Sequence, residues 1–310
     1  MSDDSSFPLI SILTPSFNRA GMIETAIQSV LNQNYPKVEH IIMDGGSTDG
    51  TIEVLKKYPH LRVISEPDQG MYDAINRGLK IFEGNYICFL NDDDMFPPDV
   101  FPKIIEAFSQ HHKADAIVGK ALVFSQSHER PDYILALDFQ RTLLDQFLNG
   151  GKLIFNSWFF RRQLFSNIGL LDDRYQIAGD MEFLIRFVLN GSTVWELPDV
   201  LYYYRQHSKS KTFSENSTSI INAGNEHLQL IRNYFLEKKI PSQFKPIFRK
   251  SAEEVSMRLS IESLKHRNFR SFFKYISTGI SYQLLFPIKF VLKSIMIVLN
   301  KFNIITSRRV

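Results

Sequence analysis

The run FLNDDDM, residues 89–95, places three consecutive aspartates directly after an apolar segment. Adjacent carboxylates repel one another, so Asp92, Asp93 and Asp94 favour a bound cation that neutralises them. Mg²⁺ and Mn²⁺ prefer oxygen ligands and are commonly held by one or two carboxylates together with substrate phosphates. The run therefore predicts a divalent metal site that serves a phosphate-bearing substrate. The alternative is a solvated acidic cap at a helix start, a role expected in part for Asp94.

A second polar turn, DGGSTDGT at residues 44–51, also follows an apolar run. Its glycines permit a sharp turn, and Ser47 or Asp49 can cap the next helix. Asp44 is harder to explain by capping, and its carboxylate could accept hydrogen bonds from a nucleobase or a ribose. The turn lacks the spacing of a Walker loop or of a dinucleotide-binding fingerprint.

The segments around these motifs alternate between apolar strands and amphipathic helices. Asn18 is expected to cap the first helix. Alternation with short connections predicts a parallel sheet with helices on both faces, and ligands bind such sheets outside the carboxyl ends of the strands. Polar runs begin there at Thr14, Asp44, Glu66 and Asn91. The predicted strands are 9–14, 38–44, 61–65 and 85–91, and the predicted helices are about 20–34, 51–58, 70–82 and from 97 onward.

The pattern is looser beyond residue 110. Trp158, among several phenylalanines, is expected to lie in the core. Residues 214–268 are typical of helices, and the last forty residues are amphipathic. Further strands are predicted at 114–124, 133–139 and 152–160, a helix at about 180–190, and a pair of strands in 193–205.

Three ordered runs resemble family 2 glycosyltransferases of the GT-A fold. They are PLISILTPSFNRAGMIETAIQSVLNQNYPKVEHIIMDGGSTDGT, SEPDQGMYDAINRG and NYICFLNDDDMFPPD, and the resemblance covers about residues 8–208. It implies an α/β nucleotide-diphospho-sugar transferase with a Rossmann-like, mostly parallel central sheet, and the residues beyond it predict a C-terminal helical extension. The corresponding domains are 1–212 for catalysis, 213–268 for the helical extension and 269–310 for a basic amphipathic tail.

The resemblance also assigns residues to the site. Asp93 matches the last acid of the D-x-D element and is the expected metal ligand, and His207 in RQHSKSKT is a further candidate ligand. Asp180 in AGDMEFLIRF matches the catalytic base, with Glu182 as the alternative. The residues implied to bind the nucleotide-sugar donor are Thr14, Pro15, Ser16, Asp44, Asp68, Asn91, Asp92 and Asp93.

Two positions depart from the family pattern. The family usually has two acids after the second strand, where this chain has Asp44 and Gly45. The first D-x-D position is Asn91, an amide that adds no charge to a metal site.

The implied chemistry is a metal-dependent glycosyl transfer. Mn²⁺ or Mg²⁺ on Asp93 offsets charge on the departing diphosphate. Asp180 takes the proton of an acceptor hydroxyl, and a single displacement inverts the anomeric configuration. The acceptor is expected to be a glycan or a lipid-linked sugar in cell-surface polysaccharide synthesis. The alternatives are a nucleotidyltransferase-like enzyme and an inactive nucleotide-sugar or cation-binding protein.

The net charge of +3 hides an asymmetry. No Asp or Glu follows Glu262, and nine Lys and Arg residues give the segment 263–310 a charge of +9, which leaves −6 for residues 1–262. A nucleic-acid-binding protein would instead carry basic residues on its folded body. The pattern indicates no nucleic-acid partner and a tail that meets an anionic surface.

The tail SYQLLFPIKFVLKSIMIVLNKFNIITSRRV, residues 281–310, has no uncharged apolar run of 18 residues. It therefore favours an interfacial helix on anionic lipid over a spanning one. The alternative is packing on the body or in a homodimer. With Cys88 as the single cysteine and no apolar N-terminal segment, the expected location is cytoplasmic and peripheral, on the inner face of the cell membrane.

Overall fold

The computed structural model describes residues 7–138, 140–150, 154–207, 217–236 and 240–283, together with residues 287, 290 and 291. The chain divides into two compact units, residues 1–213 and 214–310. The named strands all lie in the first unit, and the second unit is helical over its described residues.

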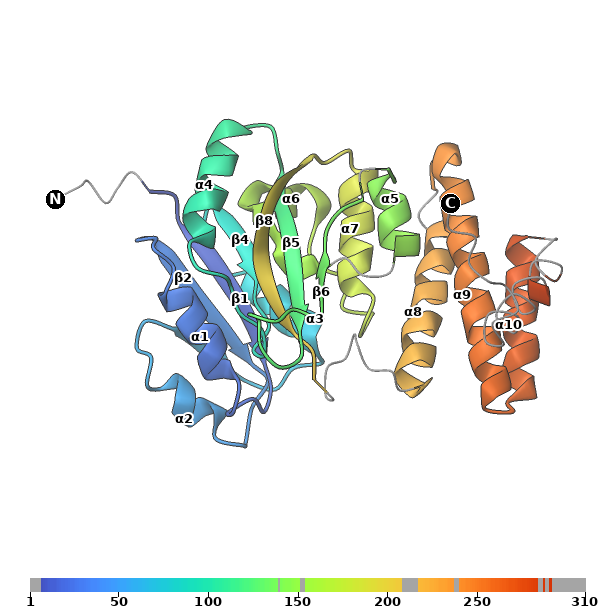
Figure 1. Ribbon diagram of the computed structural model, residues 1–310, viewed down its shortest axis with the longest axis horizontal. Helices are drawn as coiled ribbons and strands as arrows, with labels where there is room; N and C mark the ends of the chain where they lie inside the picture. Colours follow the sequence, from blue (N-terminus) through green and yellow to red (C-terminus); the bar gives the residue numbers. More distant parts are fainter. Residues whose placement is uncertain are drawn as a thin grey trace. The chain divides into compact units, whose positions relative to one another are not determined.

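One eight-stranded sheet forms the frame of the first unit (Figure 1). Its strand order is β3-β2-β1-β4-β7-β5-β6, and β8 pairs with β5. The strands are β1 Ile10–Ser16, β2 Val38–Asp44, β3 Arg62–Ser65, β4 Tyr86–Phe89, β5 Ala116–Phe124, β6 Tyr133–Leu135, β7 Trp158–Arg161 and β8 Val194–Arg205.

The sheet is mixed rather than wholly parallel. Strands β1 to β4 pair in parallel, and β8 is parallel to β5, whereas β7 and β6 run antiparallel to their neighbours. The parallel register aligns Ser16, Asp44 and Ser65 at one edge of the sheet. Polar side chains from three strand ends therefore meet at that edge, as the sequence predicts.

The second half of the sheet differs from the sequence expectation in three places. The strands predicted at 133–139 and 152–160 are shorter, spanning 133–135 and 158–161. The pair of strands predicted in 193–205 is one continuous strand, β8. Its pairing with β5 shifts register around Pro198, because a proline cannot donate a hydrogen bond to the neighbouring strand and is accommodated at a bulge.

Helices cover both faces of this sheet (Figure 1). Helices α1 and α4 pack with Ile12, Leu90 and Phe159 in one core cluster. Phenylalanines of α6 and α7 pack with Phe89 and Phe160 in the other. The helices are α1 Ile23–Leu31, α2 Thr51–Leu55, α3 Met71–Leu79, α4 Val100–Gln110, α5 Leu143–Asp145, α6 Arg162–Ile168 and α7 Gly179–Leu189, with a π-helix at Gln146–Gly150 and a 3₁₀ turn at Phe155–Ser157.

Helix α1 starts later than predicted, and Asn18 does not cap it. The residue before the helix is Met22. Asn18 adopts a left-handed backbone conformation with φ of 54°, which asparagine tolerates better than most residues. Its side-chain oxygen instead accepts a hydrogen bond from the Thr48 N–H in the loop after β2.

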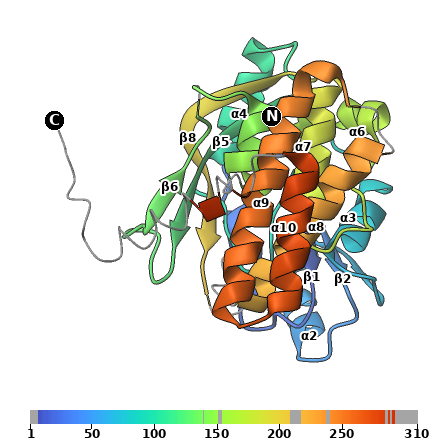
Figure 2. The ribbon, with the colours of Figure 1, turned by 90° about the vertical axis from the view of Figure 1, so that its right-hand side faces the viewer.

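The described residues of the second unit form helices that lie side by side (Figures 1 and 2). Helix α9, Lys245–Lys265, lies between α8, Ser217–Leu236, and α10, Phe269–Tyr282, after a 3₁₀ turn at Ser242–Phe244. No helix in the described part of the chain is long and apolar enough to cross a bilayer. Of the tail predicted over 269–310, α10 forms the beginning, and residues 292–310 lie outside the described residues.

Gly84, just before β4, gives a direct test of how closely β1 and β4 pack. A Cβ atom at Gly84 would lie 2.7 Å from the carbonyl oxygen of Tyr86 and 2.8 Å from the backbone nitrogen of Ser11. Because backbone cannot easily move aside, we expect Gly84→Ala to lower the free energy of unfolding by about 1–3 kcal/mol in urea titrations. Gly21→Ala, where a Cβ would meet nothing within 4 Å, is the matched control. Equal stability of the two variants would contradict this account.

Candidate active site

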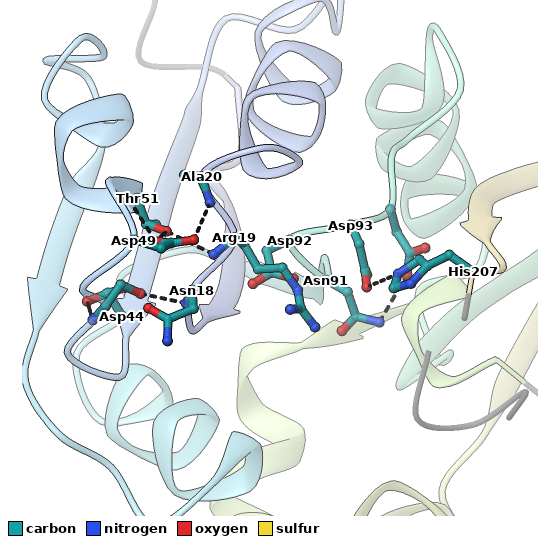
Figure 3. Close-up of polar contacts among 12 residues, drawn as sticks. Asn18, Arg19, Ala20, Asp44, Asp49, Thr51, Asn91, Asp92, Asp93 and His207 are labelled. Carbon is teal, nitrogen blue, oxygen red and sulfur yellow. Dashed lines mark hydrogen bonds and ion pairs between the residues drawn. The ribbon is translucent and has the colours of Figure 1, made fainter. Parts of the chain in front are cut away.

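The loops that follow β1 and β2 are joined by reciprocal hydrogen bonds (Figure 3). The Asn18 backbone N–H donates to Ser47 Oγ at 2.8 Å, and the Thr48 N–H donates to Asn18 Oδ1 at 2.9 Å. The Ala20 N–H donates to Asp49 Oδ2 at 3.1 Å. These contacts satisfy backbone groups that would otherwise be orphaned, and they hold the two loops as one rigid edge.

Asp44 holds the turn after β2 from within. Its Oδ2 accepts hydrogen bonds from the N–H groups of Gly46 and Ser47, at 3.0 and 2.9 Å, and from Ser65 Oγ at 2.7 Å. Its Oδ1 accepts from Ser47 Oγ at 2.5 Å. The Asp44 side chain is fully buried, so this geometry favours a turn-organising role over direct contact with a donor.

Of the three predicted residues on β1, Thr14 also lies beneath the surface. It is fully buried, and its hydroxyl lies 2.9 Å from Nε2 of His40. Burial lowers the pKa of His40 to about 3, so this imidazole is neutral near pH 7. Pro15 is partly exposed, and Ser16 ends the strand with 5% exposure.

Gly45 explains one departure from the family pattern. A Cβ atom at Gly45 would lie 2.6 Å from Asp68 Oδ2 and 3.3 Å from the ring of Phe17. The carboxylate of Asp68 therefore lies where a side chain at position 45 would be. Asp68 is oriented by the Gly70 N–H, which donates to its Oδ1 at 2.8 Å. A carboxylate from the next loop therefore occupies the space beside Gly45.

Two further residues at this edge were not singled out from the sequence. Phe17 is 56% exposed beside Gly45, which leaves an aromatic face open to solvent. Arg77 of α3 lies 2.9 Å from Glu66 and 3.9 Å from Asp68. Its buried Nε and Nη2 face carboxylates at 3.8 and 3.9 Å, which is an ion-pair distance and too long for a hydrogen bond. Both residues lie inside the runs that resemble the family, which could have identified them. The sequence analysis instead selected the polar residues at the ends of the predicted strands.

The acidic loop after β4 treats its three aspartates differently. Asp92 is nearly buried, and Arg19 Nε lies 3.3 Å from its Oδ1 (Figure 3). Burial, with a smaller contribution from neighbouring Asp93, raises the pKa of Asp92 to about 7, while Arg19 opposes the shift. Asp92 therefore links the acidic loop to the loop after β1.

Asp94 is fully buried, which corrects its predicted role as a solvated cap. Burial, with Asp93 beside it, raises its pKa well above the ordinary value. Three donors compensate for the lost water: Tyr202 Oη at 2.7 Å, the Arg205 N–H at 2.7 Å and Asn91 Nδ2 at 3.0 Å. Asp94 thus joins the acidic loop to the end of β8. The Asn91 amide is used inside the loop, where an aspartate would repel Asp94.

Asp93, the remaining aspartate of this loop, faces His207, which follows the end of β8 (Figure 3). Its Oδ2 lies 2.9 Å from His207 Nε2. Within the described ranges, no three His, Cys, Asp or Glu side chains lie close enough to hold a metal alone. A carboxylate and an imidazole nonetheless suit Mn²⁺ or Mg²⁺ when a substrate diphosphate supplies further oxygens. The residues present therefore fit the implied metal.

Asp180 is the second residue of α7, and its position depends on α3. Asn76 of α3 bonds both backbone groups of Leu171, with Nδ2 to the carbonyl at 2.8 Å and Oδ1 to the N–H at 3.0 Å. Tyr72 of α3 donates to the Ile177 carbonyl at 2.8 Å. A Cβ at Gly179 would lie 2.8 Å from the Tyr72 ring, so only glycine allows this approach. Helix α3 therefore fixes where α7 starts.

The burial of Glu182 argues against its predicted role as the alternative base. It is fully buried and pairs with Arg186 Nε at 2.7 Å, while Arg186 also donates to the carbonyls of Ile168 and Leu170. The pair secures the loop before α7. Trp158 is fully buried against phenylalanines, which confirms that it belongs to the core.

Sequence comparison identifies the family to which this site belongs. The profile described as glycosyl transferase family 2 matches residues 11–169, which contain the loops after β1, β2, β3 and β4. The chain belongs to this family. It is a glycosyltransferase, and the match confirms the resemblance seen in the sequence.

Relatives of this glycosyltransferase agree with the assignment. A PGL/p-HBAD biosynthesis glycosyltransferase of Mycobacterium tuberculosis is 30% identical over 193 residues, which cover 60% of this chain and 72% of the relative. Among solved structures, S. aureus TarS 1–349 in complex with UDP-GlcNAc has a TM-score of 0.57 at 17% identity, covering 89% of this chain and 92% of that one. A Pyrobaculum calidifontis mannosyltransferase in complex with GDP-Man and Mn²⁺ has a TM-score of 0.61 at 17% identity, covering 96% and 82%. These likenesses confirm the GT-A fold, and no finding favours a nucleotidyltransferase.

Tyr202 offers a test of the link between the acidic loop and β8. Its hydroxyl donates to Asp94, accepts from the Asn91 N–H at 3.2 Å and lies 3.1 Å from Asn156 Nδ2. Tyr202→Phe leaves buried partners unsatisfied, so we expect a loss of about 1–3 kcal/mol in the free energy of unfolding. Thermal and urea unfolding measure it.

The neighbouring residue provides the matched control for this measurement. Tyr203 stacks on His128, and its hydroxyl makes no hydrogen bond with a described residue. Tyr203→Phe should therefore change stability by less than about 0.5 kcal/mol. If both tyrosine variants were equally stable, Asp94 would not depend on Tyr202.

Proposed function

We propose that this glycosyltransferase is a metal-dependent, inverting enzyme that moves a sugar from a nucleotide-diphosphate sugar to a glycan or lipid-linked acceptor in cell-surface polysaccharide synthesis. The observation that carries the proposal is the Asp93–His207 contact at 2.9 Å, beside the carboxyl ends of β1, β2 and β4. It brings together a carboxylate and an imidazole from segments 114 residues apart in sequence. Such ligands suit a divalent ion that also binds a diphosphate.

The donor is proposed to bind along the edge formed by the β1 and β2 loops. Phe17 offers an exposed aromatic face on which a nucleobase can stack, as bases do on aromatic side chains. Asp68 offers carboxylate oxygens to base or ribose hydroxyls. Arg77 and Arg19 supply cationic donors for the diphosphate. Two solved structures of the same fold contain nucleotide-sugar donors, UDP-GlcNAc and GDP-Man, which supports a donor of this class.

Asp93 and His207 are proposed to hold Mn²⁺ or Mg²⁺ with the diphosphate. When bound, the ion supplies positive charge that stabilises the departing nucleoside diphosphate. The mannosyltransferase of similar fold was solved with Mn²⁺, which supports this choice of metal. Asp92 forms an ion pair with Arg19 and so holds the Arg19 guanidinium beside the proposed diphosphate site.

Asp180 is proposed to be the general base. Its place at the N-terminus of α7 stabilises the carboxylate through the helix dipole. The carboxylate takes the proton of the acceptor hydroxyl as that oxygen bonds to the anomeric carbon. The bond from this carbon to the diphosphate breaks in the same displacement, so the configuration inverts. No enzyme carboxylate bonds to the sugar, unlike in a retaining hydrolase.

The acid-free segment 263–310 supports a location at a membrane surface. A peripheral position on the inner face of the cell membrane would place the enzyme beside a lipid-linked acceptor. Attraction of a segment with nine basic residues to anionic lipid is the physical basis of this part of the proposal.

A donor panel with and without Mn²⁺ tests the donor and the metal together. A donor that binds the folded state raises Tm by mass action, so one nucleotide sugar should raise Tm more in the presence of Mn²⁺ than in its absence. Asp93→Asn should abolish this Mn²⁺-dependent increment and the transfer reaction, with Tm of the free protein unchanged within about 3 °C. Asp173→Asn, at an exposed position, is the control for loss of a carboxylate. A Mn²⁺ increment that survives in Asp93→Asn would rule out the metal assignment.

Replacement of Asp180 tests the base. Asp180→Asn should lower kcat by about 10²–10⁴, the usual contribution of general-base catalysis, while the affinity for the donor stays within about twofold. Steady-state kinetics together with calorimetry of donor binding separate the two effects. Lost donor affinity with a normal kcat at saturation would instead make Asp180 a donor ligand.

A further inference from the structure

Helix α10 carries an apolar stripe that nothing in the described chain covers. Phe269 is 59% exposed, Phe273 is 66% exposed and Ile280 is 36% exposed, with Ile276 partly exposed between them. These positions follow the i, i+4, i+7, i+11 spacing of one helix face. Tyr275 and Gly279 are buried on a different face, where α10 packs on α9. The stripe is therefore separate from the packing face.

Two cations border this stripe. Arg270 and Lys274 are exposed, and neither forms an ion pair with a residue in the described ranges. By contrast, Lys265 and His266 at the end of α9 lie 2.9 and 3.4 Å from Glu262, the last acidic residue of the chain. No Asp or Glu follows Glu262, so this segment has no acid of its own that could neutralise the cations beside the apolar stripe.

We infer that this face of α10, defined by Phe269, Phe273, Ile276 and Ile280 with Arg270 and Lys274, docks the protein on an anionic lipid surface. The inference rests on the membrane location in the proposed function and deepens it by naming the surface, which depends on neither donor nor metal. An interfacial helix buries its apolar stripe at the boundary of the acyl chains while its cations meet lipid phosphates. Long basic side chains reach the headgroups from beside such a stripe.

Charge decides among the occupants of this face. The same face of a second copy would bring Arg270 and Lys274 against identical cations. Phe290 packs on Phe272 of α10, at 5.8 Å between ring centroids, and leaves the stripe exposed. Residues 284–310 carry five further Lys and Arg and no acid, so they are like-charged as well. An anionic membrane complements both features of the face, since it offers apolar depth and negative phosphates together.

Vesicle cosedimentation of the full-length protein tests the inference. The vesicles are phosphatidylcholine alone and phosphatidylcholine mixed with phosphatidylglycerol, and no donor or metal is added. Phe269→Ser with Phe273→Ser should lower the partition coefficient on mixed vesicles about tenfold, through lost apolar burial. Arg270→Gln with Lys274→Gln should lower it about tenfold at low salt, and the difference from wild type should shrink in high salt.

Matched variants control for unspecific effects. Ile134→Ser removes a 51% exposed apolar side chain from β6, and Lys56→Gln with Lys57→Gln removes two exposed charges near α2. All these variants should keep the wild-type Tm, and the controls should bind vesicles as the wild type does. Wild-type partitioning of both α10 variants would overturn the inference. The inference would also be overturned if light scattering showed a wild-type dimer that Phe269→Ser with Phe273→Ser dissociates, while vesicle binding stays unchanged.

Discussion

The burial of Asp94 is the constraint on which this active site depends. A carboxylate removed from water is costly unless donors replace its hydration, and here the donors come from Asn91 of its own loop and from Tyr202 and Arg205 of β8. The loop after β4 therefore cannot adopt its shape unless β8 is in place. This dependence brings His207, two residues past the end of β8, to 2.9 Å from Asp93.

Helix α3 provides the second connection between the two halves of the first unit. Its Gly78 packs against Leu13 of β1 so closely that a Cβ would lie 2.1 Å from a Leu13 methyl carbon. On its other side, Asn76 and Tyr72 hold the segment that leads to Asp180. The proposed base and the donor edge are thus positioned by one helix. Buried, fully satisfied polar contacts of this kind give rigid placement, which a displacement reaction requires.

Two residues that the resemblance assigned to the donor site, Thr14 and Asp44, are fully buried. Asp94, expected in part as a solvated helix cap, is fully buried as well. The exposed groups at the same edge include Phe17, and Arg77 adds a guanidinium that ion pairs hold among carboxylates. Burial depends on which loops fold over a strand end, and a single sequence does not contain that information.

The sequence by itself determined the family, the positions of the first four strands along the chain and the edge at which polar residues gather, because alternating strands and helices with short loops predict a parallel sheet that binds ligands at its carboxyl ends. It also determined the acid-free tail, which is a matter of composition. Tertiary structure alone decided that β8 is one strand and that Glu182 is a buried partner of Arg186. It also decided that the Asp68 carboxylate lies where a side chain at position 45 would be. Each of these depends on contacts between residues distant in sequence, whose distances and burial no local pattern records.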